Sequence, residues 1–543
     1  HQEYLLSHPS VLSATFSLFR FLEHNPTETQ ALIETGVLPW WTLPDISITF
    51  WRPVSAVTHW LDYRLWPHAP ALMHMHSVIW FGLLVGVVSL FYRQLLINQL
   101  SAALVATLLY GLDEAHGFPV AWLANRNAIL ATFFGVLTIL VYDKWRRDAW
   151  QAGAWLTPLF LGIGLLSAEA AIAALGYLLA HALFLDSSPW RSRLTALIPA
   201  TLVVLGWRII YWLLGYGTWG SAYADPLIEP WRYIQLAIER APILLLGQFT
   251  FIPAELYNFM PWPNTLILWS VTVFALLWLG WVLSPLLRQS PLARFFASGM
   301  LLSIMPSLVI LPMNRLLFFA GLGGMGLIAL FLQQEKNRPQ EVLAKFLIVT
   351  HFLIAPISLL FMAASPNFIG DLKTGVATLP DNPEFSNRTM VVIAAPSAFY
   401  PAFIPYLREH NLEPSPPRIR LLASTTYPVE VTRVDDRTLL VQPVAGYFLG
   451  FDSAFRGDGH PFALQEMVPL SDMRAEIMAV TADGRPSQVM FHFAYPLESE
   501  KFSWFYWQDG AYKPFVVPDT KETVKVSPFS FYNALRQWVT REV

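Results

Sequence analysis

Long apolar stretches recur along the first two thirds of the chain and are separated by short polar turns. Because about 20 apolar residues cross the hydrocarbon core of a bilayer, this pattern is typical of a polytopic α-helical membrane protein. About ten stretches can be distinguished, and several of them are shorter than a full span. They cover residues 76–95, 98–112, 126–143, 153–167, 169–185, 194–215, 263–285, 292–311, 315–333 and 346–364.

Two regions outside these stretches have a different pattern. Residues 1–75 mix charged and apolar positions, as in "ITFWRPVSAVTHWLDYRLW", which is typical of amphipathic helices at a membrane interface. Toward the C-terminus, β-branched and aromatic runs alternate with "ADGR" and "QDGA", in which Asp-Gly favours hairpin turns. We therefore expect an extracytoplasmic loop with interfacial helices at 1–75, a transmembrane domain at 76–365 and an extracytoplasmic β-rich α+β domain at 366–543.

The basic residues fall in alternate loops, whereas the turn at 113–125 contains neither Lys nor Arg. By the positive-inside rule the basic loops face the cytoplasm. Residues 1–75, the loops 113–125 and 217–262 and the C-terminal domain then share the outer side. An N-terminal segment on the outer side predicts one more span before His1, about ten or eleven in all. The basic loop residues are Arg93, Lys144, Arg146, Arg147, Arg191, Arg193, Arg288, Arg294, Lys336, Arg338 and Lys345.

The composition supports this class and excludes others. Of the 543 residues, 55% are hydrophobic and only 13% are charged, against about 25% charged in soluble domains. The net charge of −3 is too small to indicate a nucleic-acid partner. Because the chain has no cysteine, disulfides, thiolate metal ligands and a cysteine nucleophile are all excluded.

Ionisable residues concentrate at the predicted outer ends of the spans. The stretch "GLDEAHGFPVAWLANRN" places two acids, a histidine and an arginine between apolar runs, where charge is costly and usually marks a site. Carboxylates can remove a proton from a hydroxyl or hold a divalent cation, and arginine suits the phosphate of a lipid. Helix capping and solvated loop charges are the alternative explanation. The residues expected to converge are Glu3, Arg52, His59, Asp62, Asp113, Glu114, His116, Arg126, Asn127, Ser167, Glu169 and Arg315.

Three segments, "FWRPVSAVTHWLDYRLW", "DEAHGFPVAWLANRNAILATFFGVL" and "LLSAEAAIAALGYLL", resemble in order and sidedness the membrane glycosyltransferases of the GT-C class. The resemblance is to the group that contains the TMTC-type protein O-mannosyltransferases and their bacterial relatives, and it covers residues 45–335. "MNRLLFF" resembles the later Glu-Arg-x-Leu-Tyr element of that family, with Asn314 in the place of the acid. The other matching residues are Arg52-Pro53, His116, Ala121-Trp122, Arg126 and Ser167-Ala168-Glu169.

The resemblance implies a GT-C fold and inverting transfer of a sugar from a polyprenyl-phosphate donor on the outer face, with an outer-loop Asp or Glu as base. Arg315 would bind the donor phosphate, helped by Arg126 or Arg208. Asp113 and Glu114 are also the expected ligands of a divalent cation, Mg²⁺ or Mn²⁺, which the sequence does not require. The expected catalytic residues are Glu3, Asp113, Glu114 and His116, and the expected substrate-binding residues are Arg52, Arg126, Asn127, Glu169, Arg208 and Arg315.

Two positions depart from the pattern of the family. Its acidic pair after the first helix is reduced to Gln2-Glu3, and Phe118-Pro119 stand where a glutamate precedes Val-Ala-Trp. The alternative hypothesis is therefore a catalytically inactive protein on a GT-C scaffold, acting as a lipid-binding or accessory subunit of a membrane complex. A transporter is a third possibility, although the polar residues gather at one face rather than at the bilayer midplane.

The expected partners are membrane lipids, a polyprenyl-phosphate sugar and a protein bound by the C-terminal domain. We expect the protein to be integral to a membrane, and we interpret this membrane as the inner membrane of a bacterium. The N-terminal loop and the C-terminal domain would then lie in the periplasm.

Overall fold

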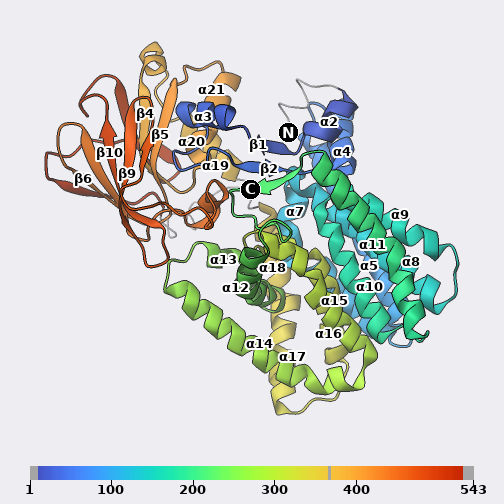
Figure 1. Ribbon diagram of the computed structural model, residues 1–543. Coiled ribbons are helices and arrows are strands. Elements are labelled where there is room, and N and C mark those ends of the chain that lie inside the picture. The colour runs from blue at the N-terminus through green and yellow to red at the C-terminus, as the bar shows by residue number, and fades with distance from the viewer. Residues whose placement is uncertain (1–9, 365–367, 530–543) are drawn as a thin grey trace.

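Helices form one part of the molecule and two β-sheets the other, in the computed structural model, which describes residues 10–364 and 368–529 (Figure 1). Each of the ten apolar stretches expected from the sequence is helical. Six helices in the described part are long and apolar enough to cross a membrane. They are α5 (Pro70–Leu95), α8 with a preceding turn (Leu123–Arg147), α11 (Trp190–Leu213), α14 (Asn264–Gln289), α15 with η4 (Pro291–Val309) and α17 to α18 (Arg338–Ala364).

Four further apolar helices are shorter, and one of them, α16 (Phe318–Leu332), lies in the interior of the helical part. They are α6 (Leu100–Gly111), α9 (Gly153–Leu165), η3 with α10 (Glu169–Phe184) and α16 (Phe318–Leu332). Residues 318–331 of α16 are all buried, because the helix packs against α15, α6 and α8. Length and composition thus support six spans, and the larger number expected from the sequence depends on these shorter helices.

Short elements connect the helices at the end nearest the β-sheets. The polar stretch after α6 folds into η1 (Glu114–His116), α7 (Gly117–Ala121) and η2 (Leu123–Asn125). The segment 217–262, expected as a loop, contains β3 (Gly217–Trp219), the 20-residue helix α12 (Pro230–Phe249) and α13 (Glu255–Asn258). Helix α12 packs on α14 and η4 (Met305–Val309), so it forms part of the helical body.

The β-rich part consists of two sheets. The smaller sheet has the order β12-β11-β4-β5. Within it, strands β11, β4 and β5 run parallel to one another. The larger sheet has the order β13-β6-β7-β10-β9-β8 and is antiparallel throughout. The strands are β4 (Thr389–Ala395), β5 (Arg418–Ser424), β6 (Val429–Arg433), β7 (Thr438–Pro443), β8 (Met467–Pro469), β9 (Met473–Val480), β10 (Pro486–Phe493), β11 (Phe502–Gln508), β12 (Ala511–Pro514) and β13 (Thr523–Val526). The helices of this part are α19 (Phe368–Val376), α20 (Phe399–Ala402) and α21 (Ile404–His410), with the 3₁₀ turns η8 (Pro383–Asn387) and η9 (Gly450–Ala454).

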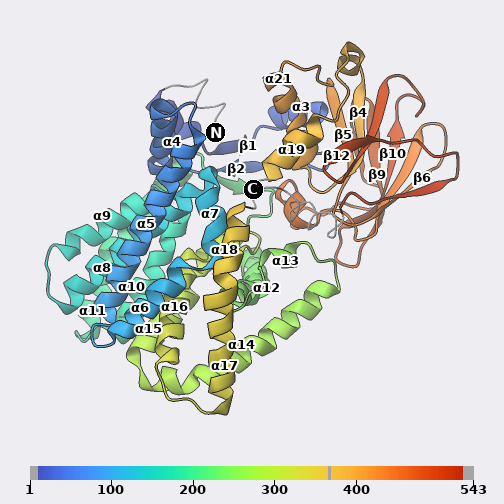
Figure 2. The same ribbon diagram turned by 180° about the vertical axis from the view of Figure 1, so that it is seen from behind.

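The N-terminal segment is shared between the two parts. Helices α2 (Val11–Ser17) and α4 (Pro53–Leu65) pack on each other beside the transmembrane helices, whereas α3 (Pro26–Thr35) lies against β5 in both views (Figures 1 and 2). Trp40 and Trp41 are buried in the same core as the two sheets. The region expected as one interfacial loop therefore contributes a helix and two tryptophans to the core of the C-terminal domain.

A small antiparallel sheet joins this segment to the connection after α11. Strands β1 (Arg20–Glu23), β2 (Ser47–Thr49) and β3 lie in that order. Ser47 pairs with Trp219, and Thr49 pairs with Gly217. Arg52 comes shortly after β2 and immediately before α4, so this sheet determines the position of Arg52.

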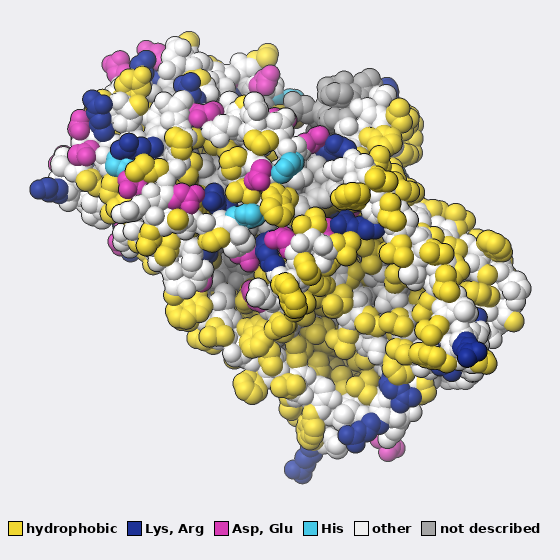
Figure 3. All heavy atoms as spheres, viewed as in Figure 1, with side chains coloured by type: hydrophobic (Ala, Val, Ile, Leu, Met, Phe, Trp, Pro, Cys, Tyr) yellow, Lys and Arg dark blue, Asp and Glu magenta, His cyan; other side chains and the backbone are white. Residues whose placement is uncertain are grey.

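The surface divides in the same way as the fold. In Figure 3 hydrophobic side chains cover the helices, whereas charged side chains gather over the C-terminal domain. Lys and Arg side chains also mark the end of the helices that lies farthest from that domain. A membrane protein has this distribution when its apolar belt faces lipid and its two ends face water.

Candidate functional site

Arg52 and Glu169 form the centre of the polar cluster. Arg52 is the residue before α4, and Glu169 begins η3. Nε and Nη2 of Arg52 lie 2.9 Å and 2.7 Å from Oε2 of Glu169. With its amide oriented to satisfy its neighbours, Asn127 of α8 accepts a hydrogen bond from Nη1 of Arg52 at 3.0 Å. Three helices are thus joined at their ends.

Arg315 lies beside this pair, and none of the described residues forms an ion pair with it. It stands in η5 (Asn314–Leu316), immediately before the buried α16, and its guanidinium carbon is 5.8 Å from the centroid of the Trp122 ring. In the described part of the chain, Nε of Arg315 is buried without a hydrogen-bond partner and no ion pair holds the guanidinium. Burial lowers the pKa of Arg315, whereas the nearby Tyr223 and Glu255 raise it and Arg52 lowers it. Among the described residues the side chain is therefore a cation without an ion-pair partner, within electrostatic range of Arg52 and Glu255.

Tyr223 and Glu255 are site residues that sequence reasoning missed. Tyr223 lies in the connection between β3 and α12, and burial raises its pKa, while Arg315 and Arg52 lower it and Glu169 raises it. Oε1 of Glu255 accepts a hydrogen bond from the backbone N–H of Asn314 at 2.8 Å. Its other oxygen, Oε2, is buried without a partner among the described residues. Glu255 thus places a carboxylate beside Asn314.

Asp113 and Glu114 lie on the other side of Arg315, because η1 packs against η5. Oδ1 of Asp113 accepts from the backbone N–H of Ala115 at 3.0 Å, and Oδ2 accepts from Nε2 of Gln248 in α12 at 3.4 Å. Both acids are nearly enclosed, with 4% of Asp113 and 5% of Glu114 exposed. Burial raises the pKa of both, and the charges of Asp113 and Glu255 raise that of Glu114 further.

Asp113 and Glu114 keep oxygen lone pairs that could contribute to a cation site. Each oxygen of Asp113 accepts one hydrogen bond from nitrogen, and each has a second lone pair with which a carboxylate can bind Mg²⁺ or Mn²⁺. Among residues 10–364 and 368–529, no group of three or more His, Asp or Glu residues could hold a metal ion. The divalent cation expected at Asp113 and Glu114 stays a prediction, and no step below depends on it.

His116 is packed among aromatic rings. It is fully buried, and its ring centroid lies 4.4 Å from that of Phe318, 4.6 Å from Tyr110 and 5.4 Å from Phe81. Neither ring nitrogen has a hydrogen-bond partner in the described part of the molecule. Burial lowers the pKa of His116 to about 3, so the ring is neutral at physiological pH. These surroundings favour a role in packing for this residue.

Arg126 also lies apart from the cluster, in an enclosed network of its own. Its Nη2 is 2.6 Å from Oδ2 of Asp62 and donates to the carbonyl of Met73 at 2.8 Å, and its Nε donates to Ser77 at 2.9 Å. Asp62 also lies 2.6 Å from Nδ1 of His76. The guanidinium is 0% exposed, so it ties α4 and α5 to α8 and has no donor directed at the Arg315 cluster.

The remaining expected residues are placed as follows. Arg208 of α11 forms an ion pair with Asp225, at the connection that also carries Tyr223. Glu3 lies outside the described residues. The structure therefore brings Arg52, Asn127, Glu169, Arg315, Asp113 and Glu114 into one neighbourhood, adds Tyr223 and Glu255 to it, and places Arg126 and His116 in separate contacts.

No protein-family model matches the chain, and no curated protein sequence matches it. Among solved structures, the chain is similar to the arabinofuranosyltransferase AftD from Mycobacteria, with 14% sequence identity and a TM-score of 0.27. The match covers 91% of this chain and 41% of the AftD chain, so the present chain spans less than half the length of that protein. A TM-score of this size does not establish a shared fold, and the site described above is interpreted from its own residues.

Proposed function

We propose that this protein is a membrane glycosyltransferase of the GT-C type that transfers a sugar from a polyprenyl-phosphate donor to an acceptor hydroxyl. The observation that supports this most is Arg315, a guanidinium with no ion-pair partner among the described residues, at the end of a buried helix and next to a second arginine and to buried carboxylates. A partly buried cation without a counterion is costly, and a phosphate ester at a membrane surface would supply the missing charge. The order of sequence segments shared with the GT-C class points to the same chemistry.

The donor would bind with its phosphate at Arg315 and its polyprenyl tail among the apolar helices. Arg315 forms charge-assisted hydrogen bonds to the phosphate oxygens, and Trp122 fixes the plane of the guanidinium from one side. Arg52 contributes positive charge while Glu169 holds its orientation. Oε1 of Glu169, which has no partner within the described residues, is suited to accept a hydrogen bond from a sugar hydroxyl.

Transfer would proceed by a single displacement with inversion. Glu114, or Asp113 beside it, takes the proton of the acceptor hydroxyl as its oxygen attacks the anomeric carbon. The bond between that carbon and the phosphate oxygen breaks, and the phosphate leaves with the bonding electrons. Arg315 stabilises the charge that develops on the leaving phosphate, so no general acid is needed. Glu3 remains a further candidate for the base.

The placement in the membrane follows from the charge distribution. The six long helices and the four shorter apolar ones would all cross the bilayer. Their basic ends would face the cytoplasm, so the polar cluster and the C-terminal domain would lie on the outer side, in a bacterium the periplasm. A protein partner bound by the C-terminal domain is part of the same proposal.

The test replaces Arg315 by Gln and by Lys in the full-length protein, reconstituted in vesicles and supplied with a panel of undecaprenyl-phosphate sugars. We expect R315Q to lower kcat/KM by about 100-fold or more, because it removes the charge that stabilises the leaving group. R315K keeps the charge and should retain more activity. R437Q, which changes an exposed arginine of the C-terminal domain, serves as the matched control and should stay near the wild-type rate. Equal rates for R315Q and R437Q would refute the proposal.

A non-catalytic role on the same scaffold is favoured by one observation, the near-complete enclosure of Asp113 and Glu114. A lipid-binding subunit would still bind undecaprenyl phosphate at Arg315 but would transfer no sugar. Thermal unfolding with and without undecaprenyl phosphate separates the two. A stabilised wild type, an unresponsive R315Q and no turnover from any donor would support the lipid-binding role and reject the transferase.

A further inference from the structure

We infer that Arg232 of α12 and Asp458 of the C-terminal domain are a positioning pair for the anion site, so that the C-terminal domain sets the geometry in which Tyr223 and Arg52 face Arg315. The ligand of that site is taken from the function proposed above, whereas the pair itself is defined by contacts.

Arg232 connects three segments through one guanidinium. Nε and Nη2 lie 3.0 Å and 2.5 Å from Oδ1 of Asp458. Nη1 donates to the carbonyl of Tyr223 at 3.1 Å, and Nη2 donates to the carbonyl of Ser221 at 3.0 Å. Nη1 also lies 2.9 Å from Oε2 of Glu229, one turn away at the start of the same helix. The planar fork of arginine makes these contacts together, and the point charge of lysine would not.

The C-terminal domain also supports the same connection through its backbone. The N–H of Gly457 donates to the carbonyl of Gly220 at 3.0 Å. A Cβ at position 457 would lie 2.1 Å from the carbonyl oxygen of Ser221, so the two backbones are in close contact. Residues 220–223 are therefore held between Arg232 on one side and the turn that carries Asp458 on the other.

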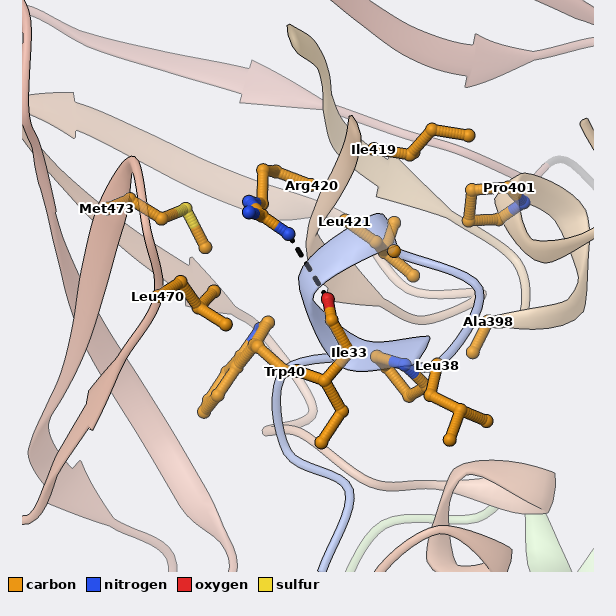
Figure 4. A pocket seen from close by; sticks show the side chains of 12 residues that line it. Ile33, Leu38, Trp40, Ala398, Pro401, Ile419, Arg420, Leu421, Leu470 and Met473 are labelled. Atoms are coloured by element: carbon orange, nitrogen blue, oxygen red, sulfur yellow. Dashed lines mark hydrogen bonds between the residues drawn. The ribbon is translucent and has the colours of Figure 1, made fainter. Parts of the chain in front are cut away.

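A second connection from the same domain leads to Arg52. Nη1 of Arg420 in β5 donates to the carbonyl of Ile33 in α3 at 3.2 Å (Figure 4). Nε1 of Trp40 donates to the carbonyl of Leu422 at 3.3 Å. The chain continues from Trp40 into β2, which pairs with β3, and Arg52 follows β2. The domain thus anchors both polypeptide segments that contribute to the cluster around Arg315, one with Arg52 and one with Tyr223.

The Arg232–Asp458 pair is exposed on one side, and an exposed ion pair on its own adds little to folding stability. The side chain of Arg232 is 12% exposed and that of Asp458 is 60% exposed. Removing Asp458 should therefore leave the fold intact and loosen residues 217–225. An intact fold in which residues 217–225 are loosened would distinguish a positioning role from a purely stabilising one.

The experiment compares D458A with a matched control, E498A. The Arg433–Glu498 pair has the same 2.5 Å separation, with exposures of 11% and 59%, and it lies wholly within the C-terminal domain. We expect D458A to increase deuterium uptake at residues 217–225 and to raise KM for the undecaprenyl-phosphate sugar about fivefold or more, with kcat changed less than about twofold. E498A should change neither, and D458E should restore both values. R232K should behave like D458A, because its single charge cannot hold both carbonyls.

Equal uptake and KM in D458A and E498A would overturn the positioning role. The positioning role would also be overturned if the change in KM of D458A merely paralleled a fall in its melting temperature. If the wild-type protein neither transfers a sugar nor binds undecaprenyl phosphate, the proposed function fails, and the uptake at residues 217–225 alone decides the role of the pair. The two proposals therefore fail on different measurements.

Discussion

Arg52 binds Glu169 through one oxygen only. Its Nε and Nη2 both contact Oε2, at 2.9 Å and 2.7 Å, and Oε1 is buried without a hydrogen-bond partner among the described residues. The guanidinium carbon of Arg52 also lies 4.2 Å from the centroid of the Phe50 ring, which fixes its plane. A carboxylate held in this way keeps one acceptor available in a buried polar site, which is what binding a ligand hydroxyl requires.

Replacing Glu169 by Gln should impair both the fold and donor binding. The substitution leaves the partly buried Arg52 without its counterion, and a hydrogen bond to a charged group contributes about 1.5–3 kcal/mol. We expect a lower melting temperature in detergent and a higher KM for the donor. Glu384, which pairs with Arg388 on the surface, provides the control E384Q, which should change neither the melting temperature nor the donor KM. A donor KM unchanged in E169Q would show that Glu169 is only a structural counterion.

Arg126 should prove structural although the sequence predicts substrate binding. R126Q removes the guanidinium from the buried carboxylate of Asp62 and leaves it only its contact with His76, and breaking a buried ion pair costs about 3–5 kcal/mol. We expect poor folding of R126Q and partial recovery in the double variant R126Q/D62N, which removes both charges. Melting temperature and the donor KM of the folded fraction are the measurements. A double variant that is stable but no longer binds donor would restore Arg126 to the site.

The helices and part of the site could be predicted from the sequence, because both depend on local patterns. The long apolar stretches indicated each helix, and the polar stretch after α6 indicated Asp113 and Glu114 as site residues. Glu255 could not be found in this way, because its role depends on α13 folding back onto Asn314, a contact between residues 59 positions apart. The docking of Trp40 against Leu422 spans 382 positions and has no local signal at all.

The pH dependence of transfer should report the buried acids. Burial and neighbouring carboxylates raise the pKa of Glu114, so its carboxyl keeps a proton at pH values where an ordinary glutamate, with a pKa of about 4.3, has lost it. A base must be deprotonated, so kcat/KM should rise with pH through an inflection above that value. The stability gained from the protonated form is present at low pH and is lost as pH rises through the raised pKa.

E114Q should abolish this inflection and lower transfer by about 100-fold or more. D113N, measured in parallel, shows which acid of the interacting pair carries the titration. D436N, at an exposed position of the C-terminal domain, should leave the profile unchanged. A profile in E114Q and D113N that matches the wild type would exclude both acids as the base and leave Glu3.

His116 should tolerate replacement by an apolar ring. Its two ring nitrogens have no hydrogen-bond partner in the described residues, so phenylalanine loses no polar contact there. We expect H116F to keep its transfer rate within about threefold and its stability within about 1.5 kcal/mol, the usual limit for swaps of similar volume. H116A should be much less stable, since it leaves a cavity between Phe318 and Tyr110. A stable H116F without activity would instead support the catalytic role expected from the sequence.

Gly36 should be essential for the contact between the N-terminal segment and the C-terminal domain. It ends α3 with φ +84°, and a Cβ there would lie 2.0 Å from the carbonyl oxygen of Ile419 in β5. G36A therefore combines backbone strain with a backbone clash, and we expect a loss of about 2–4 kcal/mol together with faster proteolysis between α3 and β2.

The matched control for this substitution is G484A. Gly484 has nearly the same φ, +83°, and a Cβ added there would meet no atom within 4 Å, so G484A isolates the strain alone at about 1–2 kcal/mol. Because Arg52 follows the same segment as Gly36, G36A should also raise the donor KM while G484A should not. Equal effects of the two variants on stability and KM would show that the docking of α3 does not position Arg52.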